Sequence, residues 1–167
     1  MANTQGPKIV LEQSPADRIL EGLAATGLVV LLVLPAVYYN DLPEIIPTHF
    51  DAFGEADGYG GKWTILLLSF IGLALYGLLT FVNSRPQHMN FPVRITPENA
   101  KRQYRLATRL IRILKALIMP MFAYISWSVI QGALSGHASL GAGFLWVVLA
   151  GVFGAIGWYF KSAYWDK

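Results

Sequence analysis

The chain has 167 residues, of which 54% are hydrophobic and 14% are charged. Soluble domains carry roughly 25% charged residues, so this composition indicates a membrane protein. Cysteine is absent, which excludes disulfides, thiolate metal sites and cysteine nucleophiles. The net charge is only +3, and no polybasic nucleic-acid-binding motif is present, which excludes a nucleic-acid-binding domain. No cleavable secretory signal is evident at the start of the chain.

Four apolar segments follow one another along the chain. Because a helix rises 1.5 Å per residue, roughly 20 apolar residues cross about 30 Å of hydrocarbon. The sequence therefore predicts an all-α, polytopic membrane protein. We expect a cytoplasmic N-terminal segment at 1–18 and a single four-helix membrane domain at 19–167. Its spans are expected at about 19–39, 63–82, 114–131 and 144–160.

The start of the first helix has a clear signature. Ser14 is a candidate N-cap, Pro15 suits the first helical position, and Asp17 favours the positive end of the helix. The apolar run that follows has one charged residue, Glu21, near its beginning.

The connector 83–113 is basic. Thr96, Pro97 and Glu98 mark a helix start, and the helix that follows is amphipathic. We expect a basic interfacial helix at the cytoplasmic surface that turns into, or runs straight into, the third span. Three roles are open for its lipid-facing stripe: it binds anionic headgroups, it serves only to set the topology, or it docks a regulator. The stripe consists of Arg102, Arg105, Arg109 and Arg112.

The distribution of lysine and arginine predicts the orientation. The loop 40–62 contains one basic residue, Lys62, and the connector 132–143 contains none. The residues 83–105 contain five. The positive-inside rule then places both termini in the cytoplasm and the loop 40–62 outside the cell.

The segment from Tyr39 to Lys62 is unlike the rest of the chain. It holds five of the ten carboxylates together with His49, two prolines and four glycines. Pro43 and Pro47 bias the residues before them toward extended backbone, and the glycines permit tight turns. We therefore expect a structured extracytoplasmic loop between the first two spans.

This segment resembles an uncharacterised bacterial membrane domain found at the start of SdpI-type immunity proteins. The resemblance rests on Leu42-Pro43, Pro47-Thr48-His49-Phe50 and Gly54-Glu55-Ala56-Asp57. It implies a multi-pass protein of the bacterial plasma membrane. It also implies a role like that of SdpI-type relatives, which protect a cell from its own secreted toxin peptide and signal to a cytoplasmic repressor.

Three interpretations of the loop remain open. It is a structural cap over the helix ends, an acidic docking surface for a cationic peptide, or a divalent metal site. The metal site would use His49, Asp51, Glu55 and Asp57, and no other cofactor is expected. The candidate binding residues are Pro47, His49, Phe50, Asp51, Gly54, Glu55, Asp57 and Lys62.

The middle of each predicted span lacks ionisable residues, which disfavours an ion-coupled transporter. We expect a binding, sensing or accessory protein that contacts membrane lipids and a cationic peptide or another membrane protein. The alternatives are a metal-dependent membrane enzyme that uses His49 with neighbouring carboxylates, and a small subunit of a larger membrane complex.

Overall fold

The computed structural model describes residues 8–165. Within them, four helices each carry an apolar stretch long enough to cross a membrane, as predicted, and this indicates a multi-pass membrane protein. In chain order the elements are α1 (Pro15–Tyr38), β1 (Ile45–Phe50), β2 (Ala56–Gly61), α2 (Thr64–Asn83), the short 3-10 helix η1 (Pro86–His88), α3 (Ala100–Ser135) and α4 (Phe144–Trp165).

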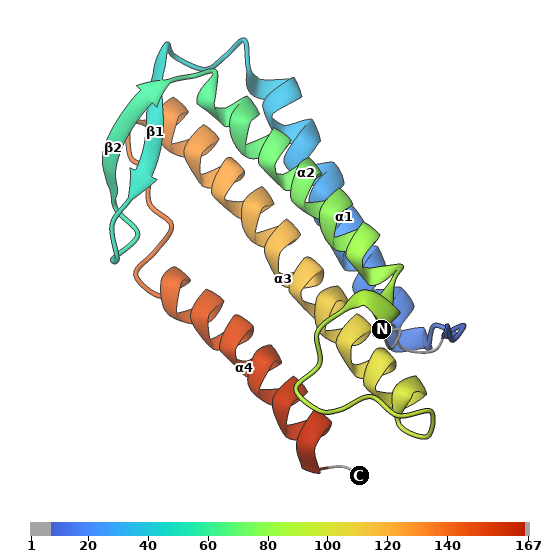
Figure 1. The fold of residues 1–167 in the computed structure, drawn as a ribbon. Helices are drawn as coiled ribbons and strands as arrows, with labels where there is room; N and C mark the ends of the chain where they lie inside the picture. The colour runs from blue at the N-terminus through green and yellow to red at the C-terminus, as the bar shows by residue number, and fades with distance from the viewer. Residues whose placement is uncertain (1–7, 166–167) are drawn as a thin grey trace, which may run out of the picture.

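The helix α3 is the spine of the fold. It is one continuous helix of 36 residues, which corresponds to a length of about 54 Å. The predicted basic helix therefore runs straight into the third span. The placement of its basic part at a membrane surface stays a prediction. The other three helices pack along α3, and α1 packs with it most extensively (Figure 1).

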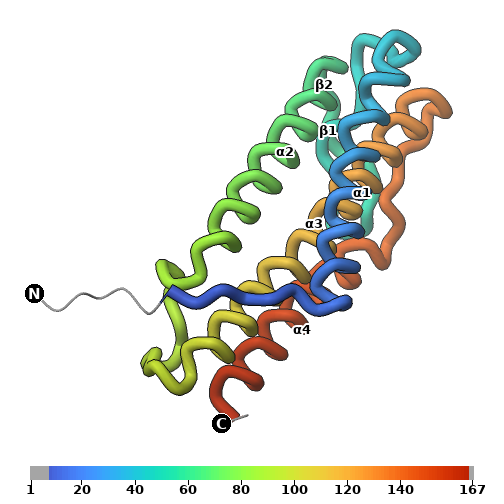
Figure 2. The backbone as a smooth tube through the Cα atoms, turned by 90° about the vertical axis from the view of Figure 1, so that its right-hand side faces the viewer, coloured from blue at the N-terminus to red at the C-terminus, as the bar shows by residue number. Residues whose placement is uncertain are grey.

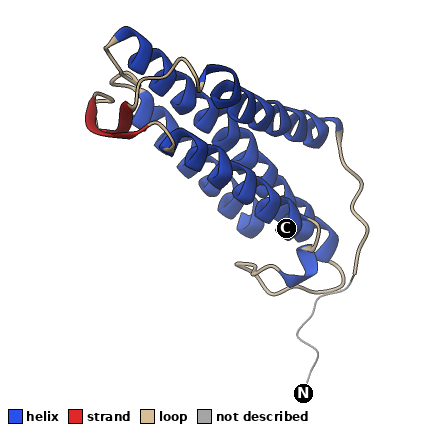
Figure 3. Ribbon diagram, turned by 90° about the horizontal axis from the view of Figure 1, so that it is seen from above, coloured by secondary structure: helices blue, strands red, loops and turns tan. Residues whose placement is uncertain are grey.

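The expectation of an all-α chain is wrong for the segment between α1 and α2. Strands β1 and β2 form an antiparallel hairpin at one end of the helices, shown in red in Figure 3. Ile45, Ile46 and Thr48 are β-branched residues that suit a strand, whereas Pro47 and the glycines of β2 disfavour a helix. The pairing is regular from Ile45↔Gly61 to Pro47↔Tyr59 and shifts register around His49.

The apolar core has two parts. In the middle of the bundle, Ala24, Leu28 and Leu31 of α1 pack with Met119 and Ala123 of α3. The second part lies under the hairpin and includes Leu42, Ile46, Ile65, Val129 and Ile130.

The start of α1 and the end of α4 lie at the same end of the bundle, opposite the hairpin (Figure 2). This arrangement follows from an even number of spans.

In this view α2 runs along one edge of the molecule. The Ser69 hydroxyl of α2 donates a hydrogen bond of 3.1 Å to the Leu31 carbonyl of α1.

Gly27 brings α1 and α3 into direct contact. A Cβ atom at this position would lie 2.5 Å from the Pro120 nitrogen and 2.8 Å from the Met119 carbonyl carbon. Those atoms belong to the backbone of α3, so they cannot move aside as a flexible side chain would. Small residues at such crossings allow helix backbones to approach closely. By contrast, a Cβ atom at Gly22 on the same helix would meet nothing within 4 Å.

We expect Gly27→Ala to lower the melting temperature of the detergent-purified protein, because overpacking costs roughly 1–3 kcal/mol. Gly22→Ala is the matched control, and it should leave the melting temperature unchanged or raise it because alanine favours helix. Differential scanning fluorimetry measures both. Equal melting temperatures for the two variants would contradict the close crossing.

Candidate functional site

The hairpin is joined to the connector between α3 and α4. The Ala56 amide donates to the Ala138 carbonyl at 3.3 Å, and the Leu140 amide donates to the Gly54 carbonyl at 2.7 Å. Between these bonds, the Ser139 hydroxyl donates to the Glu55 carboxylate at 2.7 Å. The connector therefore lies along the hairpin like a short third strand and fixes its position over the helix ends.

Asp51 and Gly54 shape the turn of the hairpin. The Asp51 carboxylate accepts hydrogen bonds from the amides of Phe53 and Glu55, at 2.8 and 3.0 Å. Gly54 has a φ of +84°, which glycine adopts without strain. A Cβ atom there would also lie 2.7 Å from the Gly141 carbonyl oxygen. Both residues are thus occupied in building the turn and in seating it against the connector.

His49 and Asp57 face each other across the two strands. The His49 Nδ1 atom lies 2.5 Å from an Asp57 carboxylate oxygen, and the two side chains are 72% and 48% exposed. Gly58 of β2 leaves room for the His49 side chain. A Cβ atom at this position would lie 2.8 Å from the His49 Cβ, which is too close. The pair stands on the surface of the hairpin, available to a partner.

Lys62 closes the base of the hairpin. Its ammonium lies 3.0 Å from the Glu44 carboxylate and 5.4 Å from the centre of the Tyr39 ring. Its amide donates to the Glu44 carbonyl at 3.0 Å. Lys62 therefore ties the two ends of the loop together.

Pro47 and Phe50 lie on the side of β1 that faces the helices. Together with His49, they border a mostly apolar cavity of about 490 Å³ between β1, α2 and α3. Pro47 is buried and Phe50 half-buried, so these two residues serve the packing of the hairpin.

The four predicted metal ligands do not converge. His49 pairs with Asp57, Asp51 holds the turn, and Glu55 accepts from Ser139. Among residues 8–165, no group of three or more histidine, aspartate or glutamate side chains is arranged to hold a metal ion.

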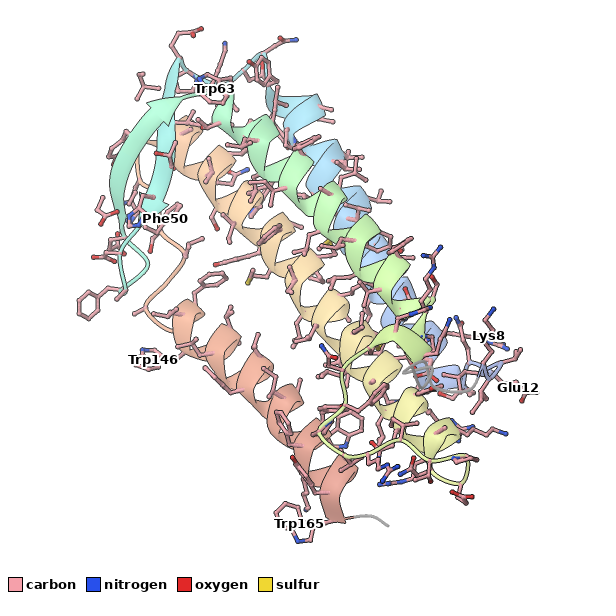
Figure 4. The ribbon with its side chains drawn as sticks, in the orientation of Figure 1. Lys8, Glu12, Phe50, Trp63, Trp146 and Trp165 are labelled. Atoms are coloured by element: carbon pink, nitrogen blue, oxygen red, sulfur yellow. The ribbon has the colours of Figure 1, made fainter. Side chains whose placement is uncertain are left out.

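The exposed surface of the hairpin combines negative charge with aromatic rings. Asp41, Glu55 and Asp57 are exposed carboxylates. Phe53, Tyr59 and Trp63 are large exposed aromatic residues, between 61% and 72% accessible. We call these six residues the hairpin surface. Figure 4 shows the Trp63 side chain at the hairpin end of the molecule.

A cluster of buried charges lies at the opposite end of the bundle. Lys115 of α3 is completely buried, and its ammonium lies 2.6 Å from the Glu21 carboxylate of α1. The ammonium also donates to the Thr80 hydroxyl of α2 at 2.9 Å and lies 4.4 Å from the centre of the Tyr76 ring. One side chain thus connects three helices.

Two arginines extend the cluster toward the start of α1. Arg109 Nε donates to Asp17 at 3.0 Å, and Arg112 Nε lies 3.3 Å from Glu21. Asp17 is itself locked in place, because its carboxylate accepts from the amide and the hydroxyl of Ser14, the N-cap of α1. The cluster contains three cations and two carboxylates, of which Asp17, Arg112 and Lys115 are buried and Glu21 and Arg109 half-buried. Charges that are shielded from water interact more strongly than charges in water.

The predicted arginine stripe is therefore divided. Arg105 is exposed, whereas Arg102 is half-buried and donates to the Ser162 carbonyl of α4. Contact of these two residues with lipid headgroups stays a prediction. Arg109 and Arg112 instead turn toward α1, and Arg112 is buried. Because α1 packs against the face of α3 that carries Arg109 and Arg112, these side chains pair with carboxylates of α1.

The partners of these arginines were not predicted from the sequence. A signal was present, because Asp17 and Glu21 are four residues apart and so share one face of α1. Arg109, Arg112 and Lys115 repeat every three residues and share one face of α3. Two helices with complementary charges at such spacing can pair along their length.

The chain is similar in sequence to a domain and to a protein whose functions are unknown. Residues 26–73, from α1 through the hairpin into α2, match the model of a domain of unknown function, DUF1648. The chain is also 24% identical over 147 residues to an uncharacterised protein of Archaeoglobus fulgidus, across 78% of this chain and 80% of that protein. No solved structure matches the chain. The segment that matches the domain holds the hairpin and leaves out the basic part of α3.

We expect Lys115→Met to destabilise the protein, because removing one partner of a buried pair leaves a buried charge uncompensated, at a cost of about 3–5 kcal/mol. Thermal unfolding in detergent, followed by scanning fluorimetry, measures the loss. Lys101→Met, an exposed position on the same helix, is the control. Adding Glu21→Leu to Lys115→Met should recover part of the stability. If the Lys115 variant melts like the Lys101 variant, the cluster does not hold the helices together.

Proposed function

We propose that this chain is a binding or sensing protein of the plasma membrane whose hairpin surface docks a cationic peptide, or a cationic segment of another membrane protein, outside the cell. One observation carries the proposal. The hairpin is held at its turn and at its base, while carboxylates and aromatic rings remain exposed on it.

The fixed backbone supports a recognition role. Bonds from the connector at 138–140 hold the turn, and the Lys62–Glu44 pair holds the base. A preformed surface loses little conformational entropy when a partner binds, so more of the interaction energy appears as affinity.

The charge of the hairpin supports a cationic partner. Lys62 is the only lysine or arginine in residues 40–62, and it is already paired with Glu44. Asp41, Glu55 and Asp57 leave the surface negative. Complementary charge speeds association and selects partners, and aromatic residues are enriched where interfaces form.

The arrangement of the charges supports an outward-facing hairpin. The basic start of α3 and the hairpin are at opposite ends of the helices (Figure 1). With the basic end in the cytoplasm, both termini are cytoplasmic and the hairpin lies outside. A peptide secreted by cells would then reach it, as the resemblance to SdpI-type immunity proteins implies.

The absence of cysteine makes this orientation directly testable. We expect Ala52→Cys, at the exposed hairpin turn, to react with a membrane-impermeant maleimide in intact cells. Asn90→Cys, exposed in the connector between α2 and α3, should react only after the cells are permeabilised. Labelling is read by gel shift, and the reverse pattern would contradict the orientation.

Binding is tested with the full chain in phosphatidylcholine nanodiscs. We expect a fluorescent amphipathic peptide of lysine and leucine to bind, and the matching peptide of glutamate and leucine not to bind. Neutralising the hairpin with Asp41→Asn, Glu55→Gln and Asp57→Asn together should weaken binding roughly tenfold or more, because each exposed charge pair is worth up to about 1 kcal/mol. Fluorescence anisotropy measures the affinity.

Two controls accompany this measurement. Empty nanodiscs report peptide that binds only to lipid, and Glu12→Gln removes a carboxylate outside the hairpin. If the hairpin triple variant binds the cationic peptide as the unmodified chain does, the docking proposal is wrong.

A further inference from the structure

The apolar cavity between β1, α2 and α3 runs along the strand. Its volume of about 490 Å³ is within the range of roughly 300–1,000 Å³ that is usual for small-molecule sites. β1 borders it from Ile46 to Phe50, a length of roughly 13 Å. In Figure 4, Phe50 lies at the end of the hairpin away from Trp63. Buried Ile65 and Val129 line the inner walls of the cavity, which is therefore elongated and apolar.

The cavity opens toward the lipid-facing side of α2. Leu67 and Ile71 border it and are 46% and 45% exposed, although both are large apolar residues. They lie in a helix that is long and apolar enough to cross a membrane, so the medium that meets them is lipid hydrocarbon. Polar solutes find no hydrogen-bond partners at such a mouth, and entry would cost them their hydration. The occupant that this mouth admits is an acyl chain.

The hairpin gives one edge of the cavity polar groups. Thr48 and His49 border the cavity and are exposed. The His49 Nδ1 atom faces the Asp57 carboxylate, which only accepts hydrogen bonds, so Nδ1 carries a proton. The Nε2 atom of the neutral imidazole is then an acceptor. Thr64, the remaining polar residue of the lining, already donates to the Gly61 carbonyl at 2.8 Å. The edge therefore suits a ligand that brings a hydroxyl.

The cavity offers no partner for a phosphate. None of the described residues that border it is a lysine or an arginine. Lys62 is the only basic residue in the loop 40–62, and its ammonium lies 3.0 Å from the Glu44 carboxylate. Asp57 adds negative charge beside His49, which disfavours an anionic headgroup. The site therefore favours a ligand with an uncharged head.

We propose that this cavity binds an uncharged membrane lipid with a free hydroxyl, of the diacylglycerol type. One acyl chain lies along β1 between α2 and α3, and the hydroxyl donates to the Nε2 atom of His49. Phosphatidylglycerol also has hydroxyls, but its phosphate brings negative charge next to Asp57. The proposal does not rest on the docking of a cationic peptide, because it concerns the side of the hairpin that faces the helices.

The test uses the full chain in phosphatidylcholine nanodiscs that contain a small fraction of diacylglycerol with a diazirine in one acyl chain. After illumination, mass spectrometry of proteolytic peptides locates the crosslinks. We expect crosslinks at Phe50 and Ile125, which border the cavity, to exceed those from the matching phosphatidylglycerol probe roughly two- to tenfold, the effect of one hydrogen bond. Crosslinks at Phe153, exposed on α4, should be equal for both probes. Equal labelling of the cavity by both probes, or stronger labelling by phosphatidylglycerol, would overturn the proposal.

Two variants assign the crosslinks to this cavity. Ile71→Trp places a larger side chain at the mouth and should reduce labelling of the cavity by the diacylglycerol probe. Leu73→Trp is the control, because Leu73 is 48% exposed on the same helix and does not border the cavity. His49→Leu should lower diacylglycerol labelling toward that of phosphatidylglycerol, whereas His137→Leu, exposed in the connector, should not.

His49 is exposed, so its variant should fold normally and decides the matter if Ile71→Trp does not fold. Diacylglycerol labelling of the cavity that is unchanged in His49→Leu, or unchanged in a folded Ile71→Trp variant, would also overturn the proposal.

Discussion

The burial of the Lys115 ammonium is the constraint on which much of the structure depends. An ammonium without water must find an anion and further acceptors, and here these come from two other helices, Glu21 of α1 and Thr80 of α2. The contact sets how far α1 and α2 are shifted along α3. Farther along the same seam, Gly27 lets α1 rest on the backbone of α3 at Pro120. Once this register is set, the end of α1 and the start of α2 lie close enough for a short hairpin to join them.

The hairpin is shaped by small residues that make room for larger ones. Gly58 makes space for His49, and Gly54 both turns the chain and allows it to approach Gly141. Because the connector at 138–140 pairs with the hairpin, the positions of α3 and α4 also affect its surface. A change in the spacing of these helices would therefore move the carboxylates of the hairpin.

Several features could be predicted from the sequence, and for clear reasons. Long apolar runs predicted four helices of spanning length, because the thickness of the hydrocarbon sets a minimum length that any sequence must meet. The Ser14 cap could be recognised because capping is local chemistry. The strands were missed because six residues with a proline or several glycines show no clear periodicity. The pairing of Arg109 and Arg112 was missed because an amphipathic helix next to a membrane looks the same whether its charges meet headgroups or a neighbouring helix.

The sequence by itself determined the number of helices that could span a membrane, the acidic character of the 40–62 segment and the basic character of the start of α3, since all three depend on composition along a local stretch. Only the tertiary structure decided that the basic helix and the third span form one continuous helix of 36 residues. Only the tertiary structure decided that His49 meets Asp57, that Asp51 and Glu55 are used to build the turn and its contact with Ser139, and that Lys115 is buried. The physical reason is that hydrogen bonds and ion pairs depend on distances of about 3 Å, and such distances are set by how helices far apart in the chain pack against one another.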